Sequence, residues 1–376
     1  MARKESPETF GAYAVTIALY SFVVGISDAG FKNFLLSRPG VVAGSGDLYA
    51  VTSSLSILFI SAFFLLLTLG GYSNVTVHLW MAITLEVLAL SVLHKGVMFE
   101  YQLSDKLSVF SIFDIWGRLV YGGIKILSYL FWGDVLLSIF VSASILFLFY
   151  MALIYRTFGQ KGLRALSASR YLESMRLFFR EWRGWMPFAL AFLAFYLHFT
   201  SNRLIVSFLL GEEALAVFAA AYLLISLGEI PVSVIWALYL PKVSSGGYEK
   251  NIHLYLLLMS VFSVFLVICY GFFSLYIFDS VFPESYSGAS SFMLGMSIYF
   301  LFRYPNLVFE IFFAAEKKYL FFTKFRLFSA VLGVLVNALL IPIYGIWVAV
   351  TCVVLCEALI TAFCIVSKFN AKIDNC

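Results

Sequence analysis

The stretch HLYLLLMSVFSVFLVICYGFFSLYIFD, residues 253–279, contains one acidic residue, Asp279 at its end, and no lysine or arginine. A helix of about 20 apolar residues crosses the ~30 Å hydrocarbon layer of a bilayer. The stretch exceeds that length. It therefore predicts a helix that spans a membrane.

Comparable apolar runs recur along the whole chain, so the stretch is not a single anchor on a globular domain. The 376 residues are 62% hydrophobic and 12% charged, with a mean hydropathy of +0.96. A soluble domain of this size does not sustain that composition. We expect an all-α membrane protein of about eleven transmembrane helices. The predicted helices cover residues 10–36, 47–71, 77–100, 107–131, 134–156, 183–209, 213–240, 253–279, 287–314, 318–341 and 344–367.

The distribution of basic residues predicts the orientation of these helices. Cytoplasmic loops are enriched in Lys and Arg. The connections between the predicted helices, with the adjoining helix ends, are called joints here. Alternate joints, which lie on the same side of the membrane, hold nineteen of the 25 basic residues: Lys32, Arg38, Lys95, Lys106, Arg156, Lys161, Arg164, Arg170, Arg176, Arg180, Arg183, Lys242, Lys250, Lys317, Lys318, Lys324, Arg326, Lys368 and Lys372. The other joints, near Tyr72, Asp134, Glu212, Pro283 and Pro342, hold none. The basic joints and the C-terminus are expected in the cytoplasm, which leaves Arg3 and Lys4 on the outer side.

A basic stretch divides the chain into two predicted lobes. Residues 1–156 hold the first five helices and residues 183–376 the last six. Between them, residues 157–182 have an apolar spacing that suits an amphipathic helix on the cytoplasmic surface. We expect this segment to link the lobes.

A weak internal sequence repeat supports this division. At an offset of 212, Phe113, Lys125 and Gly133 align with Phe325, Asn337 and Gly345. A weaker match at offset 205 aligns residues 8–14 with residues 213–219. Both matches pair a helix with the sixth helix after it, as two parallel six-helix repeats would.

Several short motifs, in order, resemble those of one transporter family. They are SPETFGAY (6–13), SDAGF (27–31), NRLI (202–205), LGEEA (210–214), AAAY (219–222), FPESY (282–286) and NALLIPIYG (337–345). In these motifs the chain resembles the polysaccharide and O-antigen flippases of the multidrug, oligosaccharidyl-lipid and polysaccharide exporter superfamily. The similarity covers nearly the whole chain. No single motif is as specific as a metal-ligand signature.

The resemblance implies a two-lobed bundle of twelve helices, and this chain begins where the family's first helix ends. It implies translocation of an undecaprenyl-pyrophosphate-linked oligosaccharide across the bacterial inner membrane, by alternating access, for O-antigen, capsule or exopolysaccharide synthesis. The expected partners are membrane lipids, a polysaccharide polymerase and a chain-length regulator, and no nucleic acid. A multidrug or cation-coupled exporter of the same superfamily is the main alternative, and a membrane polysaccharide polymerase is a weaker one.

One helix carries a polar stripe within an apolar run. Asp114, Arg118, Tyr121 and Lys125 are spaced by four, three and four residues, which places them on one helix face. The charges of Asp114 and Arg118 neutralise each other if the stripe only packs against other helices. In a water-filled cavity, the two cations outnumber the carboxylate and attract a pyrophosphate. Both interpretations stay open.

Other charges lie in predicted membrane helices, where they usually face a cavity or a partner. Arg203 and Arg303 are predicted to complete a cationic cavity, although Arg303 and Glu310, seven residues apart, also suit a structural ion pair. Further candidates for a structural, gating or ion-coupling role are Asp28, Lys32, Glu86 and Glu357, of which the last two have no cation nearby in sequence. Pro231 is predicted to bend its helix and serve as a hinge.

Enzyme and cofactor motifs are absent from the sequence. No Gly-x-Ser-x-Gly, His-Glu-x-x-His or phosphate-loop motif occurs, and the outer joints are too short for a catalytic domain. Cys352 and Cys356 are one helical turn apart, but no His or carboxylate cluster completes a four-ligand metal set. We expect a transporter without a cofactor or a metal.

The orientation is testable by labelling from outside the cell. A thiol reagent that does not cross the membrane is expected to label Glu212→Cys and not Lys317→Cys, because only the first joint lacks basic residues. Permeabilised cells, in which both sites are reachable, are the control. The reverse labelling pattern would overturn the topology.

Overall fold

The computed structural model describes part of the chain, in two compact units. The described residues are 10–11, 14–15, 31, 33–34, 93–94, 97–98, 101, 107–133, 135–164, 176, 178–244 and 252–373. The N-terminal unit lies within Phe22–Ala189, and the C-terminal unit combines Leu190–Cys376 with Met1–Ser21. All regular secondary structure in the described residues is helical, as the sequence predicts.

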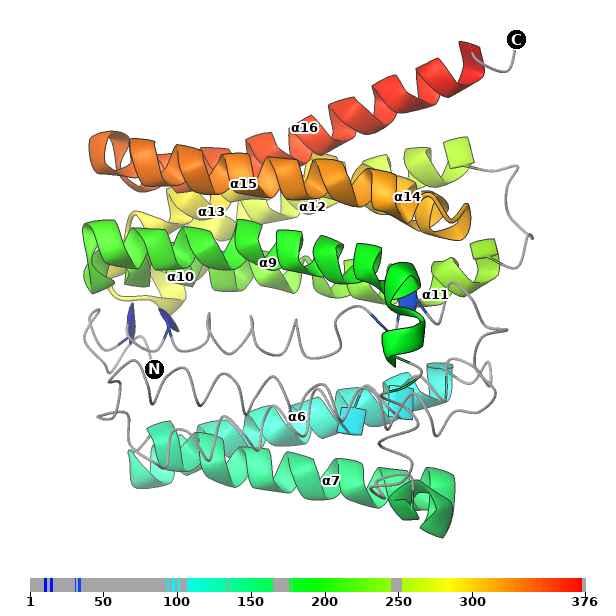
Figure 1. The fold of residues 1–376 in the computed structure, drawn as a ribbon. Helices are drawn as coiled ribbons and strands as arrows, with labels where there is room; N and C mark the ends of the chain where they lie inside the picture. The colour runs from blue at the N-terminus through cyan, green and yellow to red at the C-terminus, as the bar shows by residue number, and fades with distance from the viewer. Residues whose placement is uncertain are drawn as a thin grey trace. The chain divides into compact units, whose positions relative to one another are not determined.

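The N-terminal unit contains a helical hairpin of α6 (Leu107–Trp132) and α7 (Val135–Arg164), which pack side by side (Figure 1). The core around this hairpin is apolar and consists of Leu93, Val97, Phe110, Leu146, Tyr150, Leu153 and Ile154. The hairpin turns at Gly133, whose φ of +67° lies in the left-handed region that favours glycine. The Gly133 N–H donates to the carbonyl of Tyr129 at 2.9 Å and closes the last turn of α6.

Gly345, which aligns with Gly133 at the offset of 212, ends its helix in the same way. Its φ is +69°, and its N–H donates to the carbonyl of Ile341 at 2.8 Å. The two glycines therefore share a positive φ and the same helix-closing hydrogen bond at corresponding places in the internal repeat.

The C-terminal unit is a bundle of packed helices (Figure 1). They are α9 (Trp182–Leu210), which belongs to this unit from Leu190 onward, α10 (Glu212–Leu227), α11 (Ile230–Ser244), α12 (Ile252–Val281), the 3-10 turn η4 (Glu284–Tyr286), α13 (Ala289–Ser297), α14 (Phe300–Ala315), α15 (Tyr319–Tyr344) and α16 (Ile346–Ile373). α14 lies at the centre and contacts α11, α12, α15 and α16. Of its sixteen residues, eleven are buried.

From residue 107 onward, each predicted helix has a counterpart. The predictions 107–131, 134–156, 183–209, 253–279, 318–341 and 344–367 correspond to single helices. The predictions 213–240 and 287–314 each cover two helices, because the chain breaks after Leu227 and after Ser297. α7 continues to Arg164, so the first part of the predicted linker is helical. The predictions 10–36, 47–71 and 77–100 fall largely outside the described residues.

Six helical stretches among the described residues are long and apolar enough to cross a membrane, and seven if the bent pair Glu284–Ser297 and Phe300–Ala315 is one span. α6 is not among them, and it carries Asp114, Arg118 and Lys125.

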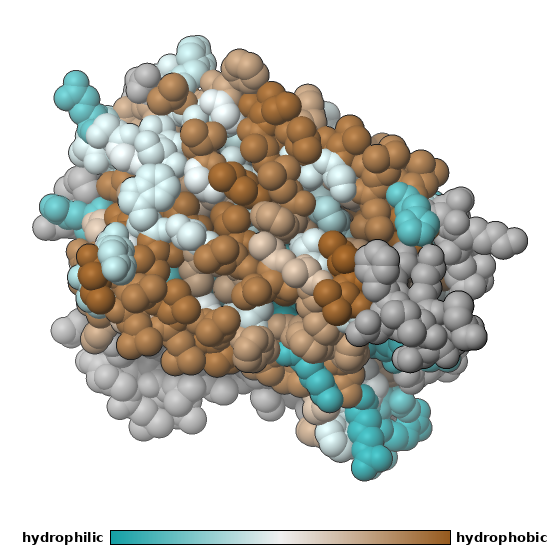
Figure 2. Space-filling model, turned by 90° about the horizontal axis from the view of Figure 1, so that it is seen from above, coloured by the Kyte–Doolittle hydropathy of each residue, from teal (hydrophilic) through white to brown (hydrophobic). Residues whose placement is uncertain are grey.

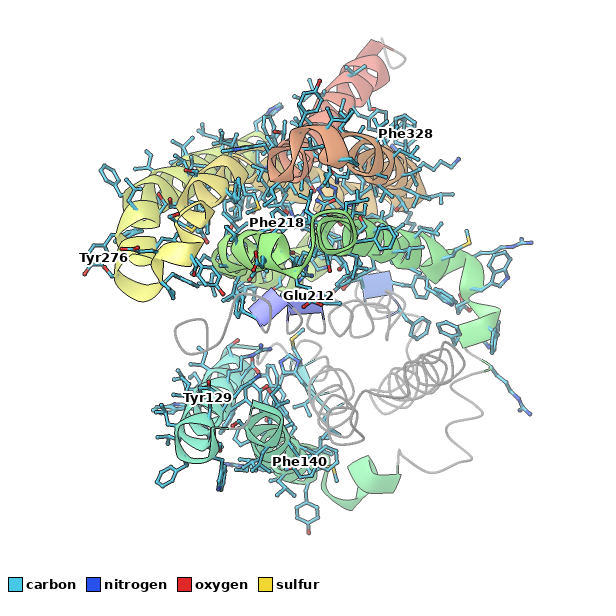
Figure 3. The ribbon with its side chains drawn as sticks, turned by 90° about the vertical axis from the view of Figure 1, so that its left-hand side faces the viewer. Tyr129, Phe140, Glu212, Phe218, Tyr276 and Phe328 are labelled. Carbon is cyan, nitrogen blue, oxygen red and sulfur yellow. The ribbon has the colours of Figure 1, made fainter. Side chains whose placement is uncertain are left out.

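The helix of residues 253–279 lies at the surface of its unit. Only 6% of the most apolar window of α12 is buried, although its mean hydropathy there is 2.5. Apolar residues dominate the face in Figure 2. In Figure 3, Tyr276 of α12 and Phe328 of α15 point outward, whereas Phe218 of α10 lies among the helices. An outer surface this apolar requires lipid as its solvent.

Two tyrosines replace backbone donors at the break between α10 and α11. The Gly228 N–H turns to the carbonyl of Ile225 at 2.9 Å, which leaves the carbonyl of Leu224 without its helical donor. Tyr270 donates its hydroxyl to that carbonyl at 2.8 Å, and Tyr304 donates to the carbonyl of Gly228 at 2.8 Å. The carbonyls of Leu224 and Gly228 are therefore both hydrogen-bonded despite the break.

The break also requires a small residue, because a Cβ on Gly228 would overlap the Phe300 ring. Gly228→Ala is expected to lower the stability of the detergent-solubilised protein by about 1–3 kcal/mol through overpacking. The matched control is Gly271→Ala in α12, where a Cβ would meet only Leu294 at 3.8 Å. The control is expected to be neutral or more stable, since Ala favours a helix. Equal thermal unfolding midpoints for the two variants would contradict the packing at Gly228.

Candidate functional site

The centre of the C-terminal unit holds a buried carboxylate between two arginines. Glu310 of α14 accepts from Arg326 Nη1 of α15 at 2.6 Å and from Arg303 Nη1 at 3.3 Å. Tyr319 also donates its hydroxyl to Glu310, at 2.7 Å. The side chains of both arginines and of Glu310 are 6–8% exposed. These are charge-assisted hydrogen bonds in a site that water hardly reaches.

A second carboxylate joins this cluster at the break between α10 and α11. Glu229 lies directly after Gly228 and accepts from Arg303 Nε at 3.3 Å. Tyr299 donates its hydroxyl to the other Glu229 oxygen at 2.7 Å. Arg303 thus joins α14 to the break between α10 and α11, where Glu229 provides the carboxylate.

Glu357 of α16 is the third carboxylate. Its Oε1 lies 3.7 Å from Arg326 Nη2, and its Oε2 accepts from Asn306 Nδ2 at 2.6 Å. Thr361 donates to Asn306 Oδ1 at 2.8 Å and so orients the amide. Glu357 is 2% exposed. Glu357 has no cation close to it in sequence, but in the structure Arg326 of α15 lies next to it.

These contacts define one cluster, the carboxylate–arginine cluster of Glu229, Arg303, Glu310, Arg326 and Glu357. With every group ionised, three carboxylates and two guanidinium groups leave a formal charge of −1. The periodicity of α14 brings Arg303 and Glu310 to one face, as their spacing of seven predicts. Both arginines are held by carboxylates, and the cluster offers one excess negative charge for a cation.

The N-terminal unit holds a separate polar site on α6. Asp114 accepts from Arg118 Nε at 2.9 Å and from the Tyr150 hydroxyl at 2.6 Å, and it lies 3.0 Å from His94 Nε2. The Arg118 side chain is nevertheless 55% exposed. Lys125 donates to the Tyr121 hydroxyl at 3.3 Å. The polar stripe predicted for this helix therefore exists, and Asp114 and Arg118 form an ion pair within it.

The remaining predicted site residues are not joined to these two sites. Arg203 of α9 is buried, with its guanidinium carbon 4.6 Å from the centre of the Tyr222 ring. Among the described residues, no ion pair involves Arg203, whereas Arg303 is paired with Glu229 and Glu310. Pro231 lies in the first turn of α11, two residues after Glu229, where its missing N–H costs nothing. Asp28, Lys32 and Glu86 lie outside the described residues.

Sequence reasoning missed Glu229 and Arg326 as site residues. Arg326 was expected in a cytoplasmic joint, and this is wrong, since it lies in α15 and is 5% exposed. The physical reason is that Glu310 and Glu357 supply the two carboxylates that a buried arginine needs. A signal was present: Arg326 and Ser329 are three residues apart in an apolar run, which marks a polar face of a membrane helix.

Glu310 is expected to hold the cluster together. Glu310→Gln keeps the size of the side chain but leaves Arg303 and Arg326 without their shared charge, and it should destabilise the protein by about 3–5 kcal/mol. The control is Glu316→Gln, which removes the carboxylate of the exposed Glu316–Lys318 pair at 3.1 Å. That pair should contribute about 0–1 kcal/mol. A Glu310→Gln protein with the thermal unfolding midpoint of the control would contradict the assignment.

Comparisons with known proteins identify the fold. No family model and no curated protein sequence matches this chain. The structure matches an inward-facing multidrug resistance MATE family transporter of the MOP superfamily, with a TM-score of 0.65 and 14% identity over 97% of this chain and 92% of that one. It matches an outward-facing one with a TM-score of 0.63 and 14% identity, over 96% of this chain and 87% of that one. A MOP superfamily transporter from Pyrococcus furiosus, described as having a binding pocket of reverse polarity, matches with a TM-score of 0.62 and 14% identity, over 96% and 88%. The chain therefore has the all-helical, multi-span membrane fold of the MATE transporters of the MOP superfamily.

Proposed function

We propose that this protein is a flippase that carries an undecaprenyl-pyrophosphate-linked oligosaccharide across the bacterial inner membrane for the synthesis of O-antigen, capsule or exopolysaccharide. Transport would proceed by alternating access. Structures of the same fold exist in inward-facing and outward-facing conformations, which supports this mechanism. The order of the sequence motifs supports the flippase branch of the superfamily.

The cationic face of α6 carries the proposal. Asp114 neutralises one positive charge, so Arg118 and Lys125 leave a formal excess of +1 on this face. Arg118 is bound to Asp114 through Nε and keeps a side chain that is 55% exposed. A guanidinium and an ammonium group are the donors that proteins use for phosphate groups. We assign the pyrophosphate of the cargo to this face.

The carboxylate–arginine cluster has a different role in the proposal. We assign Arg303 to this cluster and not to the cargo, because Glu229 and Glu310 both lie 3.3 Å from it in a buried site. The formal charge of −1 instead suits a coupling cation, a proton or Na⁺, held among Glu229, Glu310 and Glu357. The break between α10 and α11 lies next to Glu229, so occupancy of the cluster acts on the segment for which a hinge at Pro231 is proposed.

The membrane orientation, lobe boundaries and partners remain part of the same proposal. The C-terminus would face the cytoplasm, lobes 1–156 and 183–376 would be joined by a cytoplasmic linker at 157–182, and a polymerase and a chain-length regulator would act next to the flippase. A polymerase function is the less favoured proposal, since no catalytic motif accompanies it.

A multidrug or cation-coupled exporter is the alternative, and the matches to multidrug resistance MATE transporters favour it. The two functions differ in what a deletion strain accumulates. Loss of a flippase causes lipid-linked repeat units to accumulate on the cytoplasmic side, whereas loss of an exporter increases drug sensitivity. Drug sensitivity without accumulation of repeat units would favour the exporter.

The cargo site is testable in the deletion strain complemented with variants. Lys125→Gln is expected to lower surface polysaccharide and raise lipid-linked repeat units, with a normal amount of protein in the membrane, because removing a membrane-embedded cation eases insertion. The double variant Asp114→Asn with Arg118→Gln should have the same effect, since it removes the local pair together and leaves no lone charge.

The control for these variants is Ser144→Ala on α7, which removes an exposed hydroxyl bonded only to the carbonyl of Phe140. It should support normal export. Normal export from both cargo-site variants would rule out the cationic face as the cargo site and leave it as helix packing.

A further inference from the structure

A small cavity lies beside the carboxylate–arginine cluster, between α9, α15 and α16. Its volume is about 10 Å³, measured as the space open to the centre of a water-sized sphere. The lining is formed by Ala194, Phe195, His198, Arg326, Ser329, Ala330, Cys356, Glu357 and Ile360. That volume corresponds to one water molecule.

Three groups on the cavity wall have unused hydrogen-bonding capacity. His198 is 6% exposed, and neither of its ring nitrogens has a partner at hydrogen-bonding geometry, although the Cys356 thiol is its neighbour on the cavity wall. Arg326 Nη2 also has no hydrogen-bond partner. Its nearest carboxylate oxygen, Glu357 Oε1, lies 3.7 Å away, beyond direct bonding distance. Buried polar groups are nearly always satisfied, by protein or by ordered water.

The other polar groups on the wall are already paired. The Cys356 thiol donates to the carbonyl of Ser329 at 3.3 Å, and the Ser329 hydroxyl donates to the carbonyl of Cys356 at 3.0 Å. These bonds use the donors of Cys356 and Ser329. Among the described polar side chains that line the cavity, only His198 and Arg326 have a buried nitrogen without a hydrogen-bond partner.

We propose that this cavity is a binding site for one structural water molecule. The water accepts a hydrogen bond from Arg326 Nη2, donates one to Glu357 Oε1 and forms the third with a ring nitrogen of His198. Three hydrogen bonds are typical of a buried water. The gap of 3.7 Å between Arg326 and Glu357 is then closed by a bridge and not left as a long ion pair.

The water site gives His198 a role that its sequence position does not suggest. Phe195 of α9 already lies against both arginines of the cluster, with each guanidinium carbon 5.6 Å from its ring centre. The water would add a polar link from α9 through His198. His198 is a positioning residue: it holds the water that orients Arg326 and Glu357. This inference does not depend on what the protein transports.

The direct test is an experimental structure of the full chain in lipid nanodiscs at a resolution that shows ordered water. The expected result is a single density peak within about 3.2 Å of Arg326 Nη2, Glu357 Oε1 and a His198 nitrogen. Empty density, or a direct bond between His198 and Glu357, would overturn the proposal.

Two variants of similar volume test the site by thermal unfolding. His198→Gln keeps a group that bonds the water, and His198→Leu does not, so the Gln variant is expected to have the higher unfolding midpoint. A residue that only fills space in a membrane protein would give the opposite order, which would also overturn the proposal.

The matched control is Thr200→Val on the same helix. Thr200 is 3% exposed and its hydroxyl has no hydrogen-bond partner, but it does not line the cavity. Its loss should not lower the midpoint. A decrease as large as that of His198→Leu would show that any buried polar group of α9 behaves in this way, and would count against the water site.

Discussion

The structure of the C-terminal unit depends on the shared carboxylate of Glu310. It binds an arginine from its own helix, Arg303, and an arginine from α15, Arg326, in an interior that water hardly reaches. Two buried arginines without a carboxylate between them would repel each other and carry uncompensated charge. Glu229 at the break and Glu357 on α16 each lie against one of these arginines, so the centre of the cluster contributes to the position of both ends.

Such a cluster is a specificity device more than a source of stability. Burying charges costs solvation energy that their mutual attraction repays only when the geometry is good. In lipid, helices gain little from apolar contact with one another, and polar contacts select which helix faces meet. The cluster selects one register of α14 against α15 and α16. Tyr270 of α12 and Tyr304 of α14 do the same for the break between α10 and α11, because each bonds one carbonyl there.

From residue 107 onward the sequence predicted the helices well and the site in part, and the difference has a physical cause. A membrane helix is specified by its apolar length, so residues 253–279 identify α12 directly. A break is specified by what packs against it. Gly228 breaks its helix because Phe300, Tyr304 and Tyr270 fit there, and none of these residues is near it in sequence. Likewise, helical spacing connects Arg303 with Glu310, but it does not reveal that Glu357 faces Arg326.

The outward position of α12 bears on how such proteins diverge. Lipid tails require only that a surface be apolar, and they do not test its shape, so Leu, Val, Ile and Phe can exchange there at little cost. When much of the surface faces lipid, many positions can change without cost. A few buried polar contacts are then enough to keep the helices in place. The same fold at 14% identity and a TM-score of 0.65 is compatible with this constraint.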